Sequence, residues 1–254
     1  MRLVDGALAI AGDLPASSTV VVDVPLEAGE SQDSGVARFT SLQLVRDRQA
    51  QALAAVDGWA LTIGGDCAVE LASIPHALDA GEVAVVWFDA HPDLNTPESS
   101  SSAAFHGMIL RTLLGEGASG LVPARPLLPE RLVLVGARSF DGAEDEYVAE
   151  AGIRVLDGQD IDADELVAAV EATGATSVYL HVDLDVLDPA EFGSLGYPEP
   201  FGLSAAKLVQ LIRAVRARFP VAGAGITEFA PASAEQATDD LPTILRIIGA
   251  LTSA

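Results

Sequence analysis

Cysteine, aromatic residues and long apolar runs are all scarce in this sequence of 254 residues. The single cysteine, Cys67, cannot form an internal disulfide, which fits a reducing compartment such as the cytoplasm. Aromatic residues make up 5% of the chain, so we expect a core of valine, leucine, isoleucine and alanine. No stretch of about 18 uncharged apolar residues occurs, and the N-terminus carries acids where an export signal has a basic region. We therefore expect a soluble protein of the cytoplasm that does not span a membrane.

Basic residues are also few, since 14 lysines and arginines face 37 aspartates and glutamates, for a formal net charge of −23. Nucleic acids and anionic membranes are polyanions that would repel such a chain, so neither is expected as a partner. Small cations are more natural ligands. Much of the acidic excess can be a solvated surface, except where acids lie inside apolar runs and solvent cannot reach them.

The order of apolar segments predicts an α/β fold. Short β-branched runs alternate with segments of helical period, and the runs are apolar on both faces, which is typical of a parallel sheet covered by helices on both sides. We expect strands in STVVVDV, WALTIGG, EVAVVWFDAH, RLVLVGA, GIRVL, TSVYLHVDLDV and VAGAGITEF, and helices in ARFTSLQLVRDRQAQALAAV, CAVELASIPHALDA, GMILRTLLGEG, DADELVAAVEAT and SAAKLVQLIRAVRARF. No change of composition marks a linker, so residues 1–254 are expected to form a single domain.

The segment FDAHPD is the strongest local indication of chemistry. Asp89 and His91 are two residues apart on an expected strand, so their side chains point to the same side, and Asp93 follows where the strand opens into a loop. Two carboxylates and an imidazole at one strand end are costly to desolvate without a cation, and a divalent metal removes that cost. The alternative is a turn capped by an aspartate, with a solvated histidine.

The segment LHVDLDVLDP places His181, Asp183 and Asp185 at alternate positions of a second apolar strand. Buried strands seldom carry two acids on one face, so a cation is again the simplest explanation. The four carboxylates of the two segments balance two divalent cations, which favours a pair of hard metals over one zinc. A metal pair with a bridging water produces hydroxide near neutral pH and suits hydrolysis.

Two further residues could complete a hydrolytic site. Glu228 ends another expected strand and could bind a cationic substrate, whereas His106 follows a polar loop and could act as a general acid. Taken alone, Glu228 could equally begin a helix and His106 could be an ordinary loop residue.

Several segments together resemble the ureohydrolase family, which includes arginase, agmatinase and formiminoglutamase. The segments GGDC, DAHPD, Asn-Thr-Pro with His-Gly, DLDVLDP and TE occur in the order of that family, between about residue 63 and residue 231. The resemblance implies a three-layer domain with a mostly parallel eight-stranded sheet. It also implies two manganese ions whose bridging hydroxide attacks a guanidinium or formimidoyl carbon.

The resemblance assigns roles to individual residues. Asp89 and Asp183 would contact both metals, Asp93 would complete the first metal site, and His91 and Asp185 the second. The catalytic residues that the resemblance implies are Asp93, His106 and Glu228. His106 would pass a proton to the departing amine, and Glu228 would pair with the guanidinium.

The loop after Asp93 is more similar to that of arginase than to that of agmatinase. Asn95 and Ser102 fall where arginases bind the carboxylate of an amino acid, and Asp141 falls near its α-amino group. Ala104 and Ser139 depart from the arginase pattern. The expected reaction is hydrolysis of arginine to ornithine and urea. Alternatives are hydrolysis of agmatine, another guanidino acid or formiminoglutamate, and a metal-poor family member without activity. The chain lacks the tail that arginases use between subunits, so the oligomeric state is not determined by the resemblance, and a homo-oligomer is one possibility.

Cys67 stands where the family normally has a histidine ligand of the first metal. As a thiolate it would suit zinc, nickel or cobalt better than manganese, so we expect a lopsided cluster with the looser metal at Cys67. The thiol could instead be a buried filler, or His181 could supply the missing imidazole, although we expect it to lie deeper in the sheet. A cysteine nucleophile acting on a guanidinium is a further reading, but it leaves the paired acids unexplained.

Overall fold

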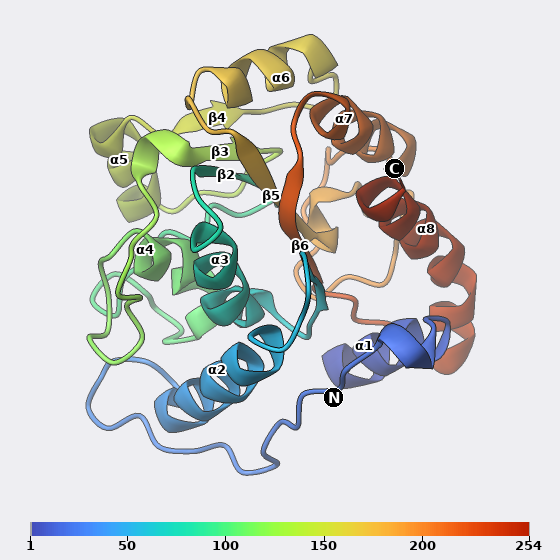
Figure 1. Cartoon of the computed structure of the whole chain (residues 1–254). Helices are drawn as coiled ribbons and strands as arrows, with labels where there is room; N and C mark the ends of the chain where they lie inside the picture. The colour runs from blue at the N-terminus through green and yellow to red at the C-terminus, as the bar shows by residue number, and fades with distance from the viewer. Residues whose placement is uncertain (1, 254) are drawn as a thin grey trace.

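The computed structural model describes residues 2–253 as three layers, with a parallel sheet between two groups of helices (Figure 1). The six strands of this part of the chain run in the spatial order β1-β6-β5-β2-β3-β4. The strands are β1 (Leu61–Ile63), β2 (Val83–Phe88), β3 (Leu132–Val135), β4 (Arg154–Leu156), β5 (Ser177–Asp183) and β6 (Val221–Thr227). All adjacent pairs are parallel, so the carboxyl ends of all strands lie at one edge of the sheet.

The helices divide between the two faces of the sheet. One apolar core joins the sheet to α1 (Arg2–Gly12), α6 (Ala163–Glu171), α7 (Ala205–Arg218) and α8 (Ala234–Thr252). The other joins it to α2 (Phe39–Leu53), α3 (Glu70–Leu78), α4 (Ile109–Leu113) and α5 (Gly142–Ala151). The first and last helices, α1 and α8, pack against each other (Figure 1). These two cores confirm the predicted α/β class with helices on both faces.

The strand count differs from the expectation. Within residues 2–253 the sheet has six strands, two fewer than the resemblance implies. The expected strand STVVVDV is extended chain at the surface without a strand partner, and Val20 and Val21 are 71% and 75% exposed. The β-branched run satisfies the strand propensity, but β1 has only β6 as a neighbour, so no strand pairing holds this segment.

The topology places polar side chains at the centre of the carboxyl edge. The chain enters the middle of the sheet at β2, adds β3 and β4 on one side, and then returns to add β5 and β6 on the other. In open parallel sheets, ligands bind where the winding direction changes, here between the ends of β2 and β5. Among the described residues, no helix combines the length and the apolar character that crossing a bilayer requires.

Candidate metal centre

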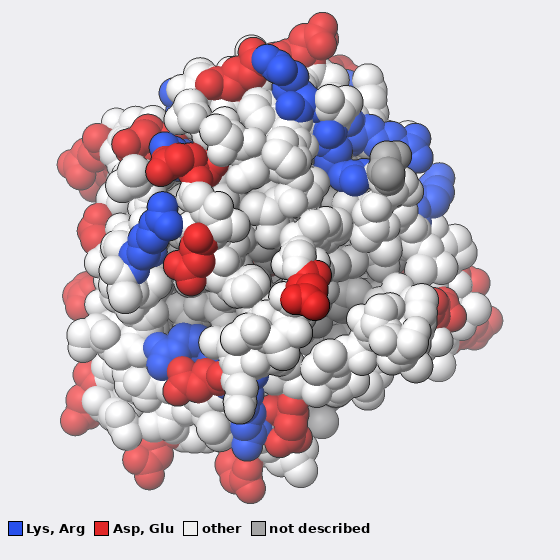
Figure 2. Space-filling model, viewed as in Figure 1, with Lys and Arg blue, Asp and Glu red and all other residues white. Residues whose placement is uncertain are grey.

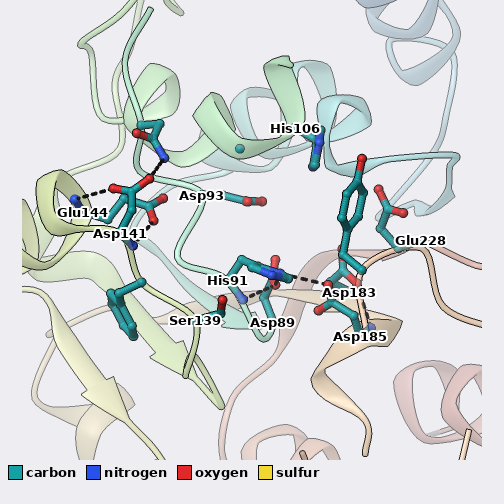
Figure 3. A pocket seen from close by; sticks show the side chains of 14 residues that line it. Asp89, His91, Asp93, His106, Ser139, Asp141, Glu144, Asp183, Asp185 and Glu228 are labelled. Carbon is teal, nitrogen blue, oxygen red and sulfur yellow. Dashed lines mark hydrogen bonds and ion pairs between the residues drawn. The ribbon is translucent and has the colours of Figure 1, made fainter. Parts of the chain in front are cut away.

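A cavity of about 260 Å³ opens at the carboxyl ends of the central strands (Figure 3). It brings together most of the site residues that the sequence predicts, which come from the ends of β2, β3, β5 and β6 and the loops that follow these strands. The predicted residues that line it are Asp89, His91, Asp93, Asn95, His106, Asp141, Asp183, Asp185 and Glu228. Cys67 and Ser102 are not among the described residues that line it.

An outer cluster consists of Asp89, His91 and Asp185, whose ligand atoms all lie within 4.8 Å of one another. Nδ1 of His91 lies 3.0 Å from Oδ2 of Asp185 and 3.6 Å from Oδ1 of Asp89. Burial lowers the pKa of His91, but the hydrogen bonds to Asp185 and Asp89 outweigh it and raise the pKa to about 11. In the metal-free protein the imidazolium supplies the positive charge that the two acids require. A divalent cation would displace that proton, and the resulting set of one neutral nitrogen and several oxygens suits an ion such as Mn²⁺.

Backbone and indole groups hold the carboxylates of the outer cluster in place. Ala90 donates its N–H to Oδ1 of Asp185 at 3.0 Å. Asp89 accepts the N–H of His91 at 2.7 Å and the indole N–H of Trp87 at 2.9 Å. Each carboxylate oxygen that accepts one of these hydrogen bonds keeps a second lone pair, so the acids are oriented and can still bind a metal ion.

An inner cluster, of Cys67, Asp89, His181 and Asp183, lies beneath the cavity and is fully buried. Sγ of Cys67 is 3.0 Å from Oδ2 of Asp183 and 3.6 Å from Nε2 of His181. The four ligand atoms again lie within 4.8 Å of one another. Asp93 is in neither cluster, so the predicted grouping of Asp93 with Cys67 is not reproduced among the described residues. His181, which we expected to lie too deep in the sheet, is a member of the inner cluster, with its Nε2 near Sγ of Cys67.

The carboxyl group of Glu70 holds His181 from behind. Oε1 of Glu70 is 2.8 Å from Nδ1 of His181, and Oε2 accepts the hydroxyl of Tyr179 at 2.5 Å. The ring of Trp87 stacks on the imidazole with centroids 3.5 Å apart. These contacts fix the ring so that Nε2 faces Cys67.

Like charges and burial destabilise the anionic forms of the inner acids. Burial raises the pKa of Asp183 well above its ordinary value, and Asp185 and Asp89 raise it further. Burial and Asp185 also raise the pKa of Asp89 to about 6. Burial, followed by Asp183, raises the pKa of the Cys67 thiol. A divalent cation would reverse all three shifts, because it favours the charged form of each ligand.

Two acids facing the cavity lack hydrogen-bond partners among the described residues: Oδ2 of Asp93, and both carboxyl oxygens of Glu228. Both residues have left-handed backbones, with φ of 52° and 63° respectively. Such conformations cost energy in residues other than glycine and cluster at functional sites. Burial, reinforced by Asp66 and Asp185, raises the pKa of Glu228 to about 8. Both observations fit a site that binds cations.

His106 lies across the cavity from the outer cluster (Figure 3). Burial lowers the pKa of His106, although Asp66 opposes the shift. The ring of Tyr197 stacks on it with centroids 5.0 Å apart. A neutral imidazole can accept or donate a proton at neutral pH.

The sequence reasoning passed over Tyr197 and Glu199, whose Oε1 is 3.9 Å from Nε2 of His91. Both lie in the Gly/Pro-rich segment after β5. This segment directly follows a strand that ends in acids, and that position is the sequence feature that could have indicated a role at the site.

The predicted substrate loop is only partly at the cavity. Asn95 donates its side-chain amide to Oδ2 of Asp141 at 2.8 Å, so these two residues form one wall. Asp141 also begins α5 with a capping box shared with Glu144. Ser102 lies apart from this wall, where its hydroxyl accepts the N–H of Ala104 at 3.2 Å.

Comparisons with known proteins match this chain to one family. Residues 8–247 match the model of the arginase family. The chain is 32% identical over 200 residues to an arginase of Bacillus caldovelox, covering 72% of this chain and 67% of that protein. It is 31% identical over 194 residues to an N(omega)-hydroxy-L-arginine amidinohydrolase of Streptomyces lavendulae, covering 76% and 68%.

Among solved structures, an arginase of Entamoeba histolytica in complex with L-ornithine superposes with a TM-score of 0.80 at 26% identity, covering 92% of this chain and 83% of that one. The sequence alignments are shorter, and one with a Bacillus subtilis arginase spans 52% of that protein's length. The family match nevertheless covers most of the chain, and its fold agrees with the layers described above. The chain therefore belongs to the arginase family.

Proposed function

We propose that this chain is a metal-dependent hydrolase that cleaves a guanidino C–N bond, with arginine as substrate and ornithine and urea as products. The observation that carries the proposal is the carboxyl group of Glu228. It is 2% exposed, neither oxygen has a partner among the described residues, and it lines the cavity with the two acidic clusters. A buried carboxylate with two free oxygens is suited to a planar cation that donates two parallel N–H bonds.

Two divalent metal ions would be held by residues that fit them. The outer cluster of Asp89, His91 and Asp185 suits Mn²⁺, while the inner cluster shares Asp89 and adds Asp183. When bound, such ions supply Lewis acidity and lower the pKa of a water molecule. The unpartnered Oδ2 of Asp93 is free to bind a cation or to accept a proton from water.

The chain's own residues supply the remaining steps. Glu228 orients the guanidinium and becomes ionised as the cation arrives, since a nearby positive charge lowers the pKa of a carboxyl group. His106, with its lowered pKa, is a neutral imidazole that can carry a proton toward the departing amine. The ring of Tyr197 stacks on His106 at the edge of the cavity.

The distal end of the substrate would meet the wall of Asn95 and Asp141. Asp141 is an acceptor suited to an α-amino group, which supports an amino acid with a guanidino side chain. The names of the Bacillus and Streptomyces relatives, an arginase and a hydroxyarginine amidinohydrolase, point to the same class. Agmatine is a second candidate because Ser102 is not at the cavity, so one of the predicted partners of a carboxylate is missing there.

The surface charge supports the remaining expectations about partners and location. On the face shown in Figure 2, acidic side chains are widely spread, whereas basic side chains gather over α7. The net charge of −23 is unfavourable for nucleic acids and anionic membranes, and the single free cysteine fits a cytoplasmic protein. Sedimentation measurements would show whether the chain forms a homo-oligomer.

The test is a urea-release assay over arginine, N-hydroxyarginine, agmatine and guanidinobutyrate, with formiminoglutamate followed by formamide release. Each substrate is tried with Mn²⁺, Co²⁺, Ni²⁺ and Zn²⁺. We expect arginine to be turned over with metal and activity to disappear after dialysis against a strong chelator. Full activity in the metal-free protein, or no product from any substrate with metals bound, would overturn the proposal.

A further inference from the structure

We propose that Cys67, His181, Asp183 and Asp89 form a mixed sulfur, nitrogen and oxygen site for a borderline metal such as Zn²⁺, in which His181 supplies the imidazole. The outer cluster then binds a harder ion, and the pair is of two different metals. This inference deepens the proposed function and rests on it only for the presence of a metal pair. It concerns which atoms of this chain bind the inner ion.

The spacing of the donor atoms fits a tetrahedral ion. Zinc binds sulfur at about 2.3 Å and nitrogen at about 2.0–2.1 Å, which separates neighbouring tetrahedral ligands by roughly 3.3–3.8 Å. Sγ of Cys67 and Nε2 of His181 are 3.6 Å apart. Sγ and Oδ2 of Asp183 are 3.0 Å apart, a distance that a small side-chain rotation lengthens. A thiolate together with an imidazole favours zinc, cobalt or nickel over manganese.

The surroundings of His181 are those of a metal-binding histidine. Glu70 is completely buried and accepts from Tyr179, so His181 most simply donates its Nδ1–H to the other oxygen. In a neutral imidazole this leaves the lone pair of Nε2 facing Cys67. A carboxylate behind the imidazole is the usual partner of a histidine that binds metal, because it fixes the tautomer and raises ligand basicity.

A cysteine nucleophile is a less satisfactory explanation of the same contacts. Cys67, His181 and Glu70 lie in the order of a nucleophile, a base and an orienting acid, but Cys67 is 1% exposed and is not among the described residues that line the cavity. A substrate carbon could not reach its sulfur. The buried acids nearby, including the unpartnered Oδ2 of Asp93 that points into the cavity, require a cation, and a cysteine nucleophile leaves that requirement unexplained (Figure 3).

X-ray absorption on the zinc-loaded protein tests the ligands directly. We expect one sulfur at about 2.3 Å with nitrogen and oxygen at about 2.0–2.1 Å. Cys67→Ser should remove the sulfur, and His181→Ala should remove one imidazole and weaken zinc binding at least 10-fold in chelator competition. His76→Ala is the matched control, because His76 lies on α3 outside both clusters, and it should change neither measurement. A zinc spectrum of the wild type without sulfur would overturn the inference.

A second variant, at the residue that orients His181, keeps the inference testable if His181→Ala does not fold. Glu70→Gln keeps every proposed ligand and should weaken zinc binding about 10–100-fold while the sulfur distance stays in the spectrum. A further measurement uses the wild type alone, where we expect one Zn²⁺ and one Mn²⁺ per chain from an equimolar mixture. Two tightly bound Mn²⁺ ions would contradict the inference even if urea is released. A zinc–sulfur bond without any urea release would instead contradict the proposed function alone.

Discussion

Gly225 on β6 lies opposite His181 on β5, and a Cβ atom at Gly225 would be 1.9 Å from Oε1 of Glu70. The absence of a side chain at this one position makes room for the carboxyl group that orients the imidazole. The backbone of one strand thus determines whether a side chain on its neighbour can face the metal site.

Gly225→Ala should therefore displace Glu70 and disturb the inner cluster. We expect a loss of about 1–3 kcal/mol in the free energy of unfolding from overpacking, and weaker zinc binding, because His181 loses its partner. Denaturant unfolding and chelator competition measure the two effects. Gly249→Ala is the control, since no atom lies within 4 Å of a Cβ there and the position is inside α8, so stability should rise slightly. Equal behaviour of the two variants would contradict the prediction.

Glu228→Gln should stabilise the metal-free protein at alkaline pH. Burial, with Asp66 and Asp185, raises the pKa of Glu228 from 4.5 to about 8. A raised carboxyl pKa gives stability that is complete below about pH 4.5 and lost as pH rises through 8. The glutamine variant lacks this loss, so it should exceed the wild type by about 2–4 kcal/mol above pH 8 and converge with it in acid. Unfolding curves across pH 4–9 test this, with Glu98→Gln, at an exposed position, as control.

In the metal-loaded protein, the same Glu228→Gln change should impair substrate use and leave metal binding intact. Two charge-assisted hydrogen bonds to a guanidinium become weaker neutral ones, so we expect kcat/KM to fall about 100-fold. Metal content by elemental analysis should not change, because Glu228 is in neither cluster. Loss of a metal ion from this variant would show that the role assigned to Glu228 is incorrect.

His106→Ala should lower kcat by about 10²–10⁴, with part of the rate restored by added imidazole. The reason is that burial leaves His106 as a neutral imidazole beside the cavity, able to move a proton. Steady-state kinetics with and without imidazole measure this. Tyr197→Phe keeps the ring that stacks on His106 and removes only the hydroxyl, so a similar loss in that variant would argue against a proton carrier at His106.

Cys67→His alone should destabilise the protein, because the larger ring enters a buried space 3.6 Å from His181. The double variant Cys67→His with His181→Ser makes room for the new ring and exchanges sulfur for nitrogen. We expect it to bind Mn²⁺ more tightly than the wild type does and Zn²⁺ less selectively. Competition binding of the two metals checks this, and an unchanged preference would mean that Cys67 and His181 do not select the metal.

The sequence predicted the fold class because the β-branched runs that became β1 to β6 are apolar on both faces. It failed at residues 18–24, where the same composition lies exposed, since propensity does not reveal whether a neighbouring strand is available. Helices α1, α5 and α8 were not anticipated. The first turn of α5 was hidden by an acid-rich sequence with little apolar period, although its capping box is visible in hindsight.

The acids of the site could be predicted because each ends or follows an apolar strand, and parallel strands end at one edge. The orientation of the His181 ring could not be predicted, because it depends on Glu70, which lies 111 residues away in sequence. Ser102 was expected at the substrate from the resemblance of its loop to that of arginase, but such a resemblance does not determine which way a hydroxyl turns. Tyr197 reaches His106 from a segment whose path no periodicity describes.

Trp87 touches both clusters, since its ring stacks on His181 and its indole N–H is donated to Asp89. The chain has only two tryptophans, and the other, Trp59, packs at the margin of the opposite core. The fluorescence of Trp87 is therefore a built-in optical reporter of the centre. In a Trp59→Phe background, its emission should follow ion loading in real time, without a dye and without turnover.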